Sequence, residues 1–200
     1  MHNNINIRNG GNMKSCINIF YQLTVRDKQG KIVSKTPISR SKSFVVGFLK
    51  ILQSQLTGLA TTVKATDASS QACAATSSNL AMFSPASTTT WGILLGIGST
   101  PPDNLDYVME TLIADGNGAG QLEYAAHGAI DAQEVGANVD LQLSRTMQNL
   151  SGGGINVTEA GIVTYFGASK FGMIIHDIFA VVAVANGETI TVTYTIRTTV

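Results

Sequence analysis

The sequence predicts a mainly-β protein: a β-sandwich or jelly-roll with one amphipathic helix at about residues 43–57 and an extended N-terminal arm. Three observations lead to this fold class. Six or more strand-like runs, separated by turn residues, fill the second half of the chain. One window alone, residues 41–59, repeats its apolar residues with a helical period. Charged residues make up 13% of the chain, about half the usual level, and Thr, Ser, Asn, Gly and Ala take their place.

The first 40 residues predict an arm followed by a hairpin. Residues 1–15 are rich in Asn and Gly and have no periodicity, so we expect an arm that is ordered only when a partner holds it. Residues 16–25 are strand-like, and the turn residues 27–30 lead into a second short strand at 31–33. We therefore expect a basic arm and β-hairpin over residues 1–40, and a single β-sandwich domain with a packed helix over residues 41–200.

The helix is predicted from an apolar stripe with the spacing i, i+3, i+4, i+7. Its members are Val45, Phe48, Leu49, Leu52, Leu56 and Leu59. Ser41 or Ser43 could cap the start, and Gly58 lies near the end. The opposite face lacks the dense positive charge of helices that lie on membranes, so the stripe predicts protein core or a subunit interface.

The remaining elements follow from local patterns. We expect a short strand at 61–65, a loop at 68–85, a buried strand at 91–97, a turn at 98–104, a short helix at 106–113 and a loop at 115–120. Further strands are expected at 121–126, 139–147, 155–165, 171–179, 181–185 and 190–196. In the strand at 139–147, apolar residues and Arg145 alternate with polar ones, and Asn186-Gly187 is typical of a hairpin turn between the last two strands.

Charge is unevenly distributed along the chain. Residues 1–50 hold nine lysines and arginines against one acid, a net charge of +8, whereas residues 51–200 carry −8. Such asymmetry can indicate nucleic-acid binding. The basic residues are spaced among apolar ones, however, and this favours docking of the basic residues 1–50 on an acidic neighbouring protein. We therefore expect no nucleic acid as a partner.

The cysteines and the first residues indicate whether the chain is secreted or inserted in a membrane. Cys16 and Cys73 are far apart and follow no secretory segment, so neither a disulfide framework nor a zinc site is expected. The first residues are too polar for a signal peptide, and no window approaches 18 consecutive apolar residues. We expect no membrane association, and export by host lysis would fit such a chain.

Catalytic patterns were sought among the histidines and the glycine-rich runs. A Ser-His-Asp triad needs a base oriented by an acid, but His176 and Asp177 are neighbours in a strand and point to opposite faces. His127 lies near a strand end. The glycines of residues 116–120 precede a β-type run rather than the helix that a phosphate loop requires. The sequence therefore predicts no enzyme, no catalytic residue and no cofactor.

Two pairs of acids could hold calcium or serve as acid and base: Asp103 with Asp106, and Asp131 with Glu134. A calcium loop needs alternating oxygen ligands and a closing Glu, which neither pair has. Turn capping is the expected role of the first pair, and no metal site is predicted.

Several blocks of the chain resemble a group of phage-encoded virion proteins. The blocks are residues 41–49 (SKSFVVGFL), 91–100 (WGILLGIGST), 106–113 (DYVMETLI), 118–124 (GAGQLEY), 143–152 (LSRTMQNLSG), 157–161 (VTEAG) and 184–196 (VANGETITVTYTI). Together the resemblance spans roughly three quarters of the chain. The group has an Arg-Asp pair where this chain has His176-Asp177, which puts a salt bridge in doubt but not the fold.

The resemblance implies a non-enzymatic bacteriophage structural protein located in the virion and assembled in the host bacterial cytoplasm. A head-associated role as minor capsid, decoration or cement protein is favoured. A tail, neck or baseplate component and a receptor- or glycan-binding module are the alternatives. Expected partners are other virion proteins, such as major capsid or tail proteins, and further copies of the chain. The candidate interface residues are Phe44, Val45, Phe48, Leu49, Leu52, Arg8 and Lys14.

Overall fold

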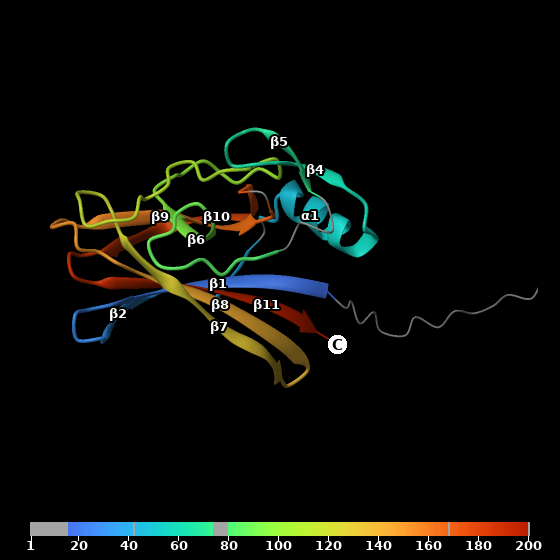
Figure 1. Ribbon diagram of the computed structural model, residues 1–200. Coiled ribbons are helices and arrows are strands. Elements are labelled where there is room, and N and C mark those ends of the chain that lie inside the picture. Colours follow the sequence, from blue (N-terminus) through green and yellow to red (C-terminus); the bar gives the residue numbers. More distant parts are fainter. Residues whose placement is uncertain (1–15, 42, 74–79, 168, 200) are drawn as a thin grey trace, which may run out of the picture.

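Two antiparallel sheets lie face to face and enclose the core (Figure 1). The computed structural model describes residues 16–41, 43–73, 80–167 and 169–199. The larger sheet has the order β2-β1-β11-β8-β7, with β3 also pairing β1. Its strands are β1 (Cys16–Arg26), β2 (Ile32–Lys35), β3 (Ser39–Arg40), β7 (Glu123–Val135), β8 (Asn138–Gln148) and β11 (Thr189–Thr199). These sheets confirm the mainly-β fold, whereas the jelly-roll subclass stays a prediction.

The smaller sheet has the order β10-β9-β6 and is buried on both faces. Its strands are β6 (Gly92–Gly96), β9 (Ile155–Tyr165) and β10 (Phe171–Val184). One face packs on the larger sheet. The helix α1 (Val46–Thr57) and the hairpin of β4 (Thr61–Lys64) and β5 (Ser70–Cys73) lie on its other side (Figure 1). This double burial explains why β6 has a continuous apolar run rather than an alternating one.

The helix starts later than the sequence predicts and buries a different face. Neither Ser41 nor Ser43 caps it: Val45 precedes the first turn and no side chain caps the helix. Residues 43–45 instead extend along the edge of β10, where the Val45 N–H donates to the Ile174 carbonyl over 3.2 Å. Pairing with the sheet edge thus replaces the first predicted turn of helix. Gly58 ends the helix in the left-handed conformation, as expected.

The buried face of α1 is formed by one large residue, Ile51, between two small ones, which corrects the predicted stripe. Gly47, Ile51 and Ser54 are buried, whereas Leu49 and Leu56 are 61% and 77% exposed. A Cβ at Gly47 would lie 2.6 Å from the Met173 carbonyl oxygen, so the helix backbone approaches β10 closely. Half of the apolar stripe therefore faces outward: Leu49, Leu56 and Leu59.

Three further predictions are corrected. Residues 106–113 form no helix, since Leu112 bridges to the edge of β6 and the Ile97 N–H donates to Thr111. Part of the predicted loop at 68–85 is strand β5, paired with β4. The turn at Asn186-Gly187 exists, but β10 and β11 lie in different sheets, so the turn connects the two layers rather than forming a hairpin.

The first hairpin is confirmed. β1 pairs antiparallel with β2 across a turn in which Gly30 has a φ of 81°. β1 also pairs along all of its 11 residues with β11, so the hairpin is part of the larger sheet. The arm at residues 1–15, including the candidate interface residues Arg8 and Lys14, lies outside the described residues.

Candidate functional site

A buried ionic cluster joins β9, β10 and the segment 98–111. His176 on β10 is 3% exposed, and its two ring nitrogens face carboxylates: Nδ1 lies 2.6 Å from Asp106 and Nε2 lies 2.9 Å from Glu159. The Glu159 carboxylate is fully buried and also accepts backbone N–H groups from Gly98, Glu110 and Thr111 at 3.0, 2.6 and 3.2 Å. Glu159 thereby anchors an otherwise irregular segment to the sheet.

Carboxylate oxygens face both ring nitrogens of His176, and this arrangement favours the doubly protonated ring. Burial opposes its charge, but hydrogen bonds to Glu159 and Asp106 outweigh burial and raise the pKa of His176 above its ordinary value. Burial likewise opposes the charge of Glu159, yet hydrogen bonds from His176 and the three backbone N–H groups lower its pKa. The ring has no free lone pair, and so it is a structural clamp rather than a general base.

Asp177 points away from His176 and belongs to a separate group, as expected for neighbours in a strand. It accepts hydrogen bonds from the Ser41 and Ser43 side chains and from the Tyr194 hydroxyl at 3.2 Å. Burial raises the pKa of Asp177, against the effect of these hydrogen bonds. The two serines predicted as helix caps therefore serve to hold a buried carboxyl group.

His127 lies beside Ser84, but the two do not have the geometry of a catalytic serine and its base. The Ile93 N–H donates to Nε2 over 2.7 Å, so this nitrogen holds the lone pair, and Nδ1, 3.0 Å from Ser84 Oγ, carries the proton. Both a donor and an acceptor of the Ser84 backbone lie near Nδ1, its N–H at 3.2 Å and its carbonyl oxygen at 3.3 Å, and the shorter bond from Ile93 to Nε2 favours the tautomer with the proton on Nδ1. A catalytic base must turn its lone pair toward the serine, and His127 turns it toward Ile93. Burial and the nearby Arg145 charge lower the pKa of His127 to about 4, so the ring is neutral at pH 7.

Arg145 connects the same region to the loop before β6. Its guanidinium is buried and donates to four backbone carbonyls: Ala125 at 2.8 Å, Ile93 at 3.1 Å, Pro85 at 3.1 Å and Thr88 at 2.8 Å. It also lies 4.8 Å from the centroid of the Tyr124 ring. Burial lowers the pKa of Arg145 to about 10. The planar guanidinium group can donate to four fixed carbonyl oxygens at once, so Arg145 holds the backbone of the loop before β6 in place.

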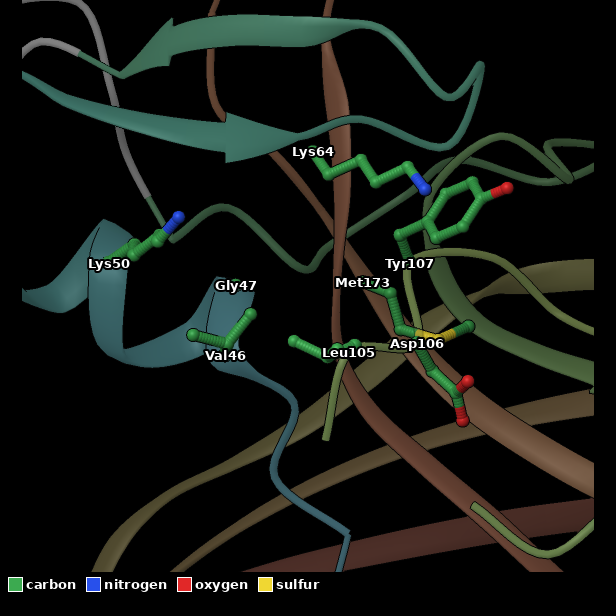
Figure 2. Close-up of a pocket in the computed structure, with 8 residues that line it drawn as sticks. All are labelled: Val46, Gly47, Lys50, Lys64, Leu105, Asp106, Tyr107 and Met173. Carbon is green, nitrogen blue, oxygen red and sulfur yellow. The ribbon is translucent and has the colours of Figure 1, made fainter. Parts of the chain in front are cut away.

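A pocket of about 270 Å³ lies between α1, β4 and the segment around residue 106 (Figure 2). Figure 2 shows Lys50 and Lys64 on its upper side, with the Lys64 Nζ 3.6 Å from the centroid of the Tyr107 ring. Met173 lines its floor, and Asp106 adds a carboxylate to the lining. The two ammonium groups could attract an anion, but Asp106 opposes this. The lining provides no nucleophile and base in contact.

The candidate interface residues separate into two sets. Phe44 and Phe48 are half-buried and stack with centroids 4.5 Å apart, Val45 is buried, and Leu52 is half-buried. Only Leu49 is strongly exposed. The structure adds three exposed neighbours on or just after the helix: Val46, Leu56 and Leu59. We call Val46, Leu49, Leu56 and Leu59 the helix surface.

The acid pairs and the possibility of a metal site were also examined. Asp103 accepts the Leu105 N–H at 2.8 Å, and Asp106 accepts the Asp103 N–H at 2.8 Å, which confirms turn capping for the first pair. Asp131 and Glu134 lie exposed on β7. Within the described ranges no group of three His, Cys, Asp or Glu side chains is arranged to hold a metal ion.

Comparison with known proteins gave no match. No family model, no curated protein and no solved structure matches this chain. No helix among the described residues is long and apolar enough to cross a membrane.

Sequence reasoning missed Glu159 and the role of Arg145, although each left a signal. Glu159 is the one charged residue of an otherwise apolar or neutral strand at 155–165, and Arg145 occupies an apolar position in the alternation at 139–147. A charged residue at a buried position needs partners. The signal shows that partners exist, but not which segments provide them.

Proposed function

We propose that this chain is a non-enzymatic structural subunit of a bacteriophage virion, with a head-associated role as minor capsid, decoration or cement protein. The observation that carries the proposal is the helix surface. Val46, Leu49 and Leu56 share one side of α1, because helix residues are about 100° apart, and Leu59 follows it. Their exposed fractions of 38%, 61%, 77% and 65% describe an apolar patch suited to contact with another protein.

The state of the histidines supports a structural rather than a catalytic role. In His127 and His176 every ring nitrogen has a partner within the fold. Charged groups elsewhere in the interior likewise bind backbone, as Arg145 and Glu159 do. The buried polar groups thus stabilise one rigid shape, which suits a subunit that must repeat the same contacts many times.

The first experiment measures assembly of the full chain. Light scattering and electron microscopy of the purified protein should show discrete oligomers or larger assemblies. Leu49→Asp with Leu56→Asp should keep the fold, because both side chains point to solvent, and should reduce the assembled fraction at least tenfold. Gln55→Asp, exposed on a different side of the same helix, is the control and should assemble as the wild type does. Assembly of the leucine variant at the wild-type level would exclude the helix surface as the contact.

The virion assignment needs a separate test. Immunogold microscopy with an antibody against the chain should label heads of the virus particles produced from the genome that carries this gene. Label on the tail or baseplate would replace the head role by the tail alternative, and label at a fibre tip would support receptor or glycan binding. Particles that carry no label would refute the virion proposal.

A further inference from the structure

Each sheet has two edges, and segments outside the sheet cover part of both edges of the smaller one. Residues 43–45 pair with the outer side of β10, and residues 111–113 pair with β6. The edges of the larger sheet are formed by β7 on one side and by β2 and β3 on the other (Figure 1). An uncovered edge offers a row of backbone donors and acceptors to another strand.

The β7 edge is covered over only its first part. Near its start, the His127 N–H donates to Ser84 and the Ser87 N–H donates to Tyr124. Beyond this point, within the described chain, residues 128–135 pair with β8 alone. This open part contains no Lys and no Pro, two residues that commonly protect an edge, and its one irregularity is a register shift against β8 between Ile130 and Gln133. Its charged side chains are Asp131 and Glu134, and both are exposed.

The opposite edge is similar in length but basic. Residues 32–40 run along β1: β2 and β3 both pair with it, and between them the Thr36 N–H donates to the Leu23 carbonyl. Lys31, Lys35 and Arg40 give this edge its positive charge. It also exposes apolar side chains, with Ile32 at 43%, Val33 at 51% and Ile38 at 69% exposed. Lysines at an edge oppose pairing with an identical edge, but they favour pairing with an acidic one. Pro37, between β2 and β3, has no backbone N–H, so the pairing surface consists of the two strands on either side of it.

We propose that the basic edge of one copy, residues 32–40, pairs with the acidic edge of a second copy, residues 128–135, so that the larger sheet continues from subunit to subunit. Charge complementarity selects the partner. Two β7 edges would place Asp131 and Glu134 against each other, and two β2 edges would oppose lysines. The contact is head-to-tail, so it generates a ring or a filament rather than a closed dimer. The inference rests on the proposed assembly function and names one of its contacts.

Charge reversal tests the pairing. The basic-edge variant, Lys31→Glu with Lys35→Glu, has two acidic edges, and the acidic-edge variant, Asp131→Lys with Glu134→Lys, has two basic edges. By sedimentation velocity at low salt, each variant alone should associate at least tenfold more weakly than the wild type. An equimolar mixture should regain association, because every contact in it joins an acidic edge to a basic one. High salt should weaken both the wild-type and the mixed assemblies.

The matched control is Lys50→Glu with Lys64→Glu, which makes the same charge change at the pocket and should leave association unchanged. Amide exchange at residues 128–135 should be slowed in wild-type assemblies and fast in either variant alone. Failure of the mixture to associate, or wild-type association of each variant alone, would overturn edge pairing. If assembly then depends on Leu49 and Leu56, the structural function stands without this contact. A wild-type chain that is monomeric throughout would refute edge pairing between copies, and the virion role would then be decided by the immunogold labelling.

Discussion

Replacing Glu159 with Gln tests whether one buried carboxylate holds the segment 98–111 in place. Glu159 Oε1 contacts His176 and the Glu110 N–H, and Oε2 accepts the N–H groups of Gly98 and Thr111. Gln has the same shape but keeps one oxygen and places an amide NH2 at the other position. In either orientation the NH2 meets two donors, so two hydrogen bonds are lost and the charge opposite His176 disappears.

The expected loss of stability follows from these two bonds. A hydrogen bond to a charged group contributes about 1.5–3 kcal/mol, so two account for about 3–6 kcal/mol. A neutral amide costs less to bury than a carboxylate, which offsets part of the loss. We therefore expect Glu159→Gln to lower the free energy of unfolding by about 3–5 kcal/mol, or the melting temperature by roughly 10 °C for a domain of this size.

Urea unfolding followed by circular dichroism measures this difference, and amide exchange locates it. Exchange should quicken first at Glu110, or at Gly98 and Thr111, according to which oxygen the NH2 group replaces. Glu134→Gln makes the same chemical change at an exposed site and should leave stability unchanged. A loss of less than about 1 kcal/mol in Glu159→Gln, with normal protection of the three amides, would refute the anchoring role.

Three further predictions follow from the buried groups. Arg145→Lys should lower the free energy of unfolding by at least about 3 kcal/mol in urea, because an ammonium group cannot reach all four carbonyls and each buried acceptor left alone costs about 1–3 kcal/mol. Stability should be greatest near pH 6.5. The raised pKa of His176 makes stability fall as pH rises above about 6.5, and the lowered pKa of His127 makes it fall as pH drops from about 6.5 to 4. His176→Gln should remove only the fall in stability above pH 6.5. Urea unfolding at a series of pH values measures this, and a stability that rises above pH 6.5 in the wild type would contradict the prediction. Phe48→Asp should destabilise the fold by breaking the stack with Phe44, and wild-type stability in the same melts would contradict that packing.

Local patterns predicted the strands well because alternation reflects burial directly. The period-two runs became β8 and β11, and the continuous apolar run became β6, which is covered on both faces. The helix was found but its buried face was not. Pattern reading assigns the large apolar residues to the interior, whereas α1 packs through Gly47 and Ser54, whose small side chains allow a close backbone approach.

Interactions between distant residues account for the remaining errors. The spacing in residues 106–113 looks helical, but Glu159 captures two backbone N–H groups of this segment from 48 or more positions away. At Asn186-Gly187 the turn was predicted correctly, yet turn chemistry does not determine which sheet the next strand enters. The exposure of the candidate interface residues could be predicted in part: Leu49 is exposed, whereas Val45 is buried and Arg8 and Lys14 lie outside the described residues.

The position of β11 has a consequence for biosynthesis. β11 lies between β1 and β8 and pairs with both along its whole length, so without it the larger sheet consists of two separate pieces. During translation, β1 leaves the ribosome early and has no partner on this side until residues 189–199 follow. The sheet is therefore completed last, and a chain that stops before β11 has no continuous sheet linking its basic edge to its acidic one. Synthesis through residue 199 is thus a condition for the proposed extension of the sheet between subunits.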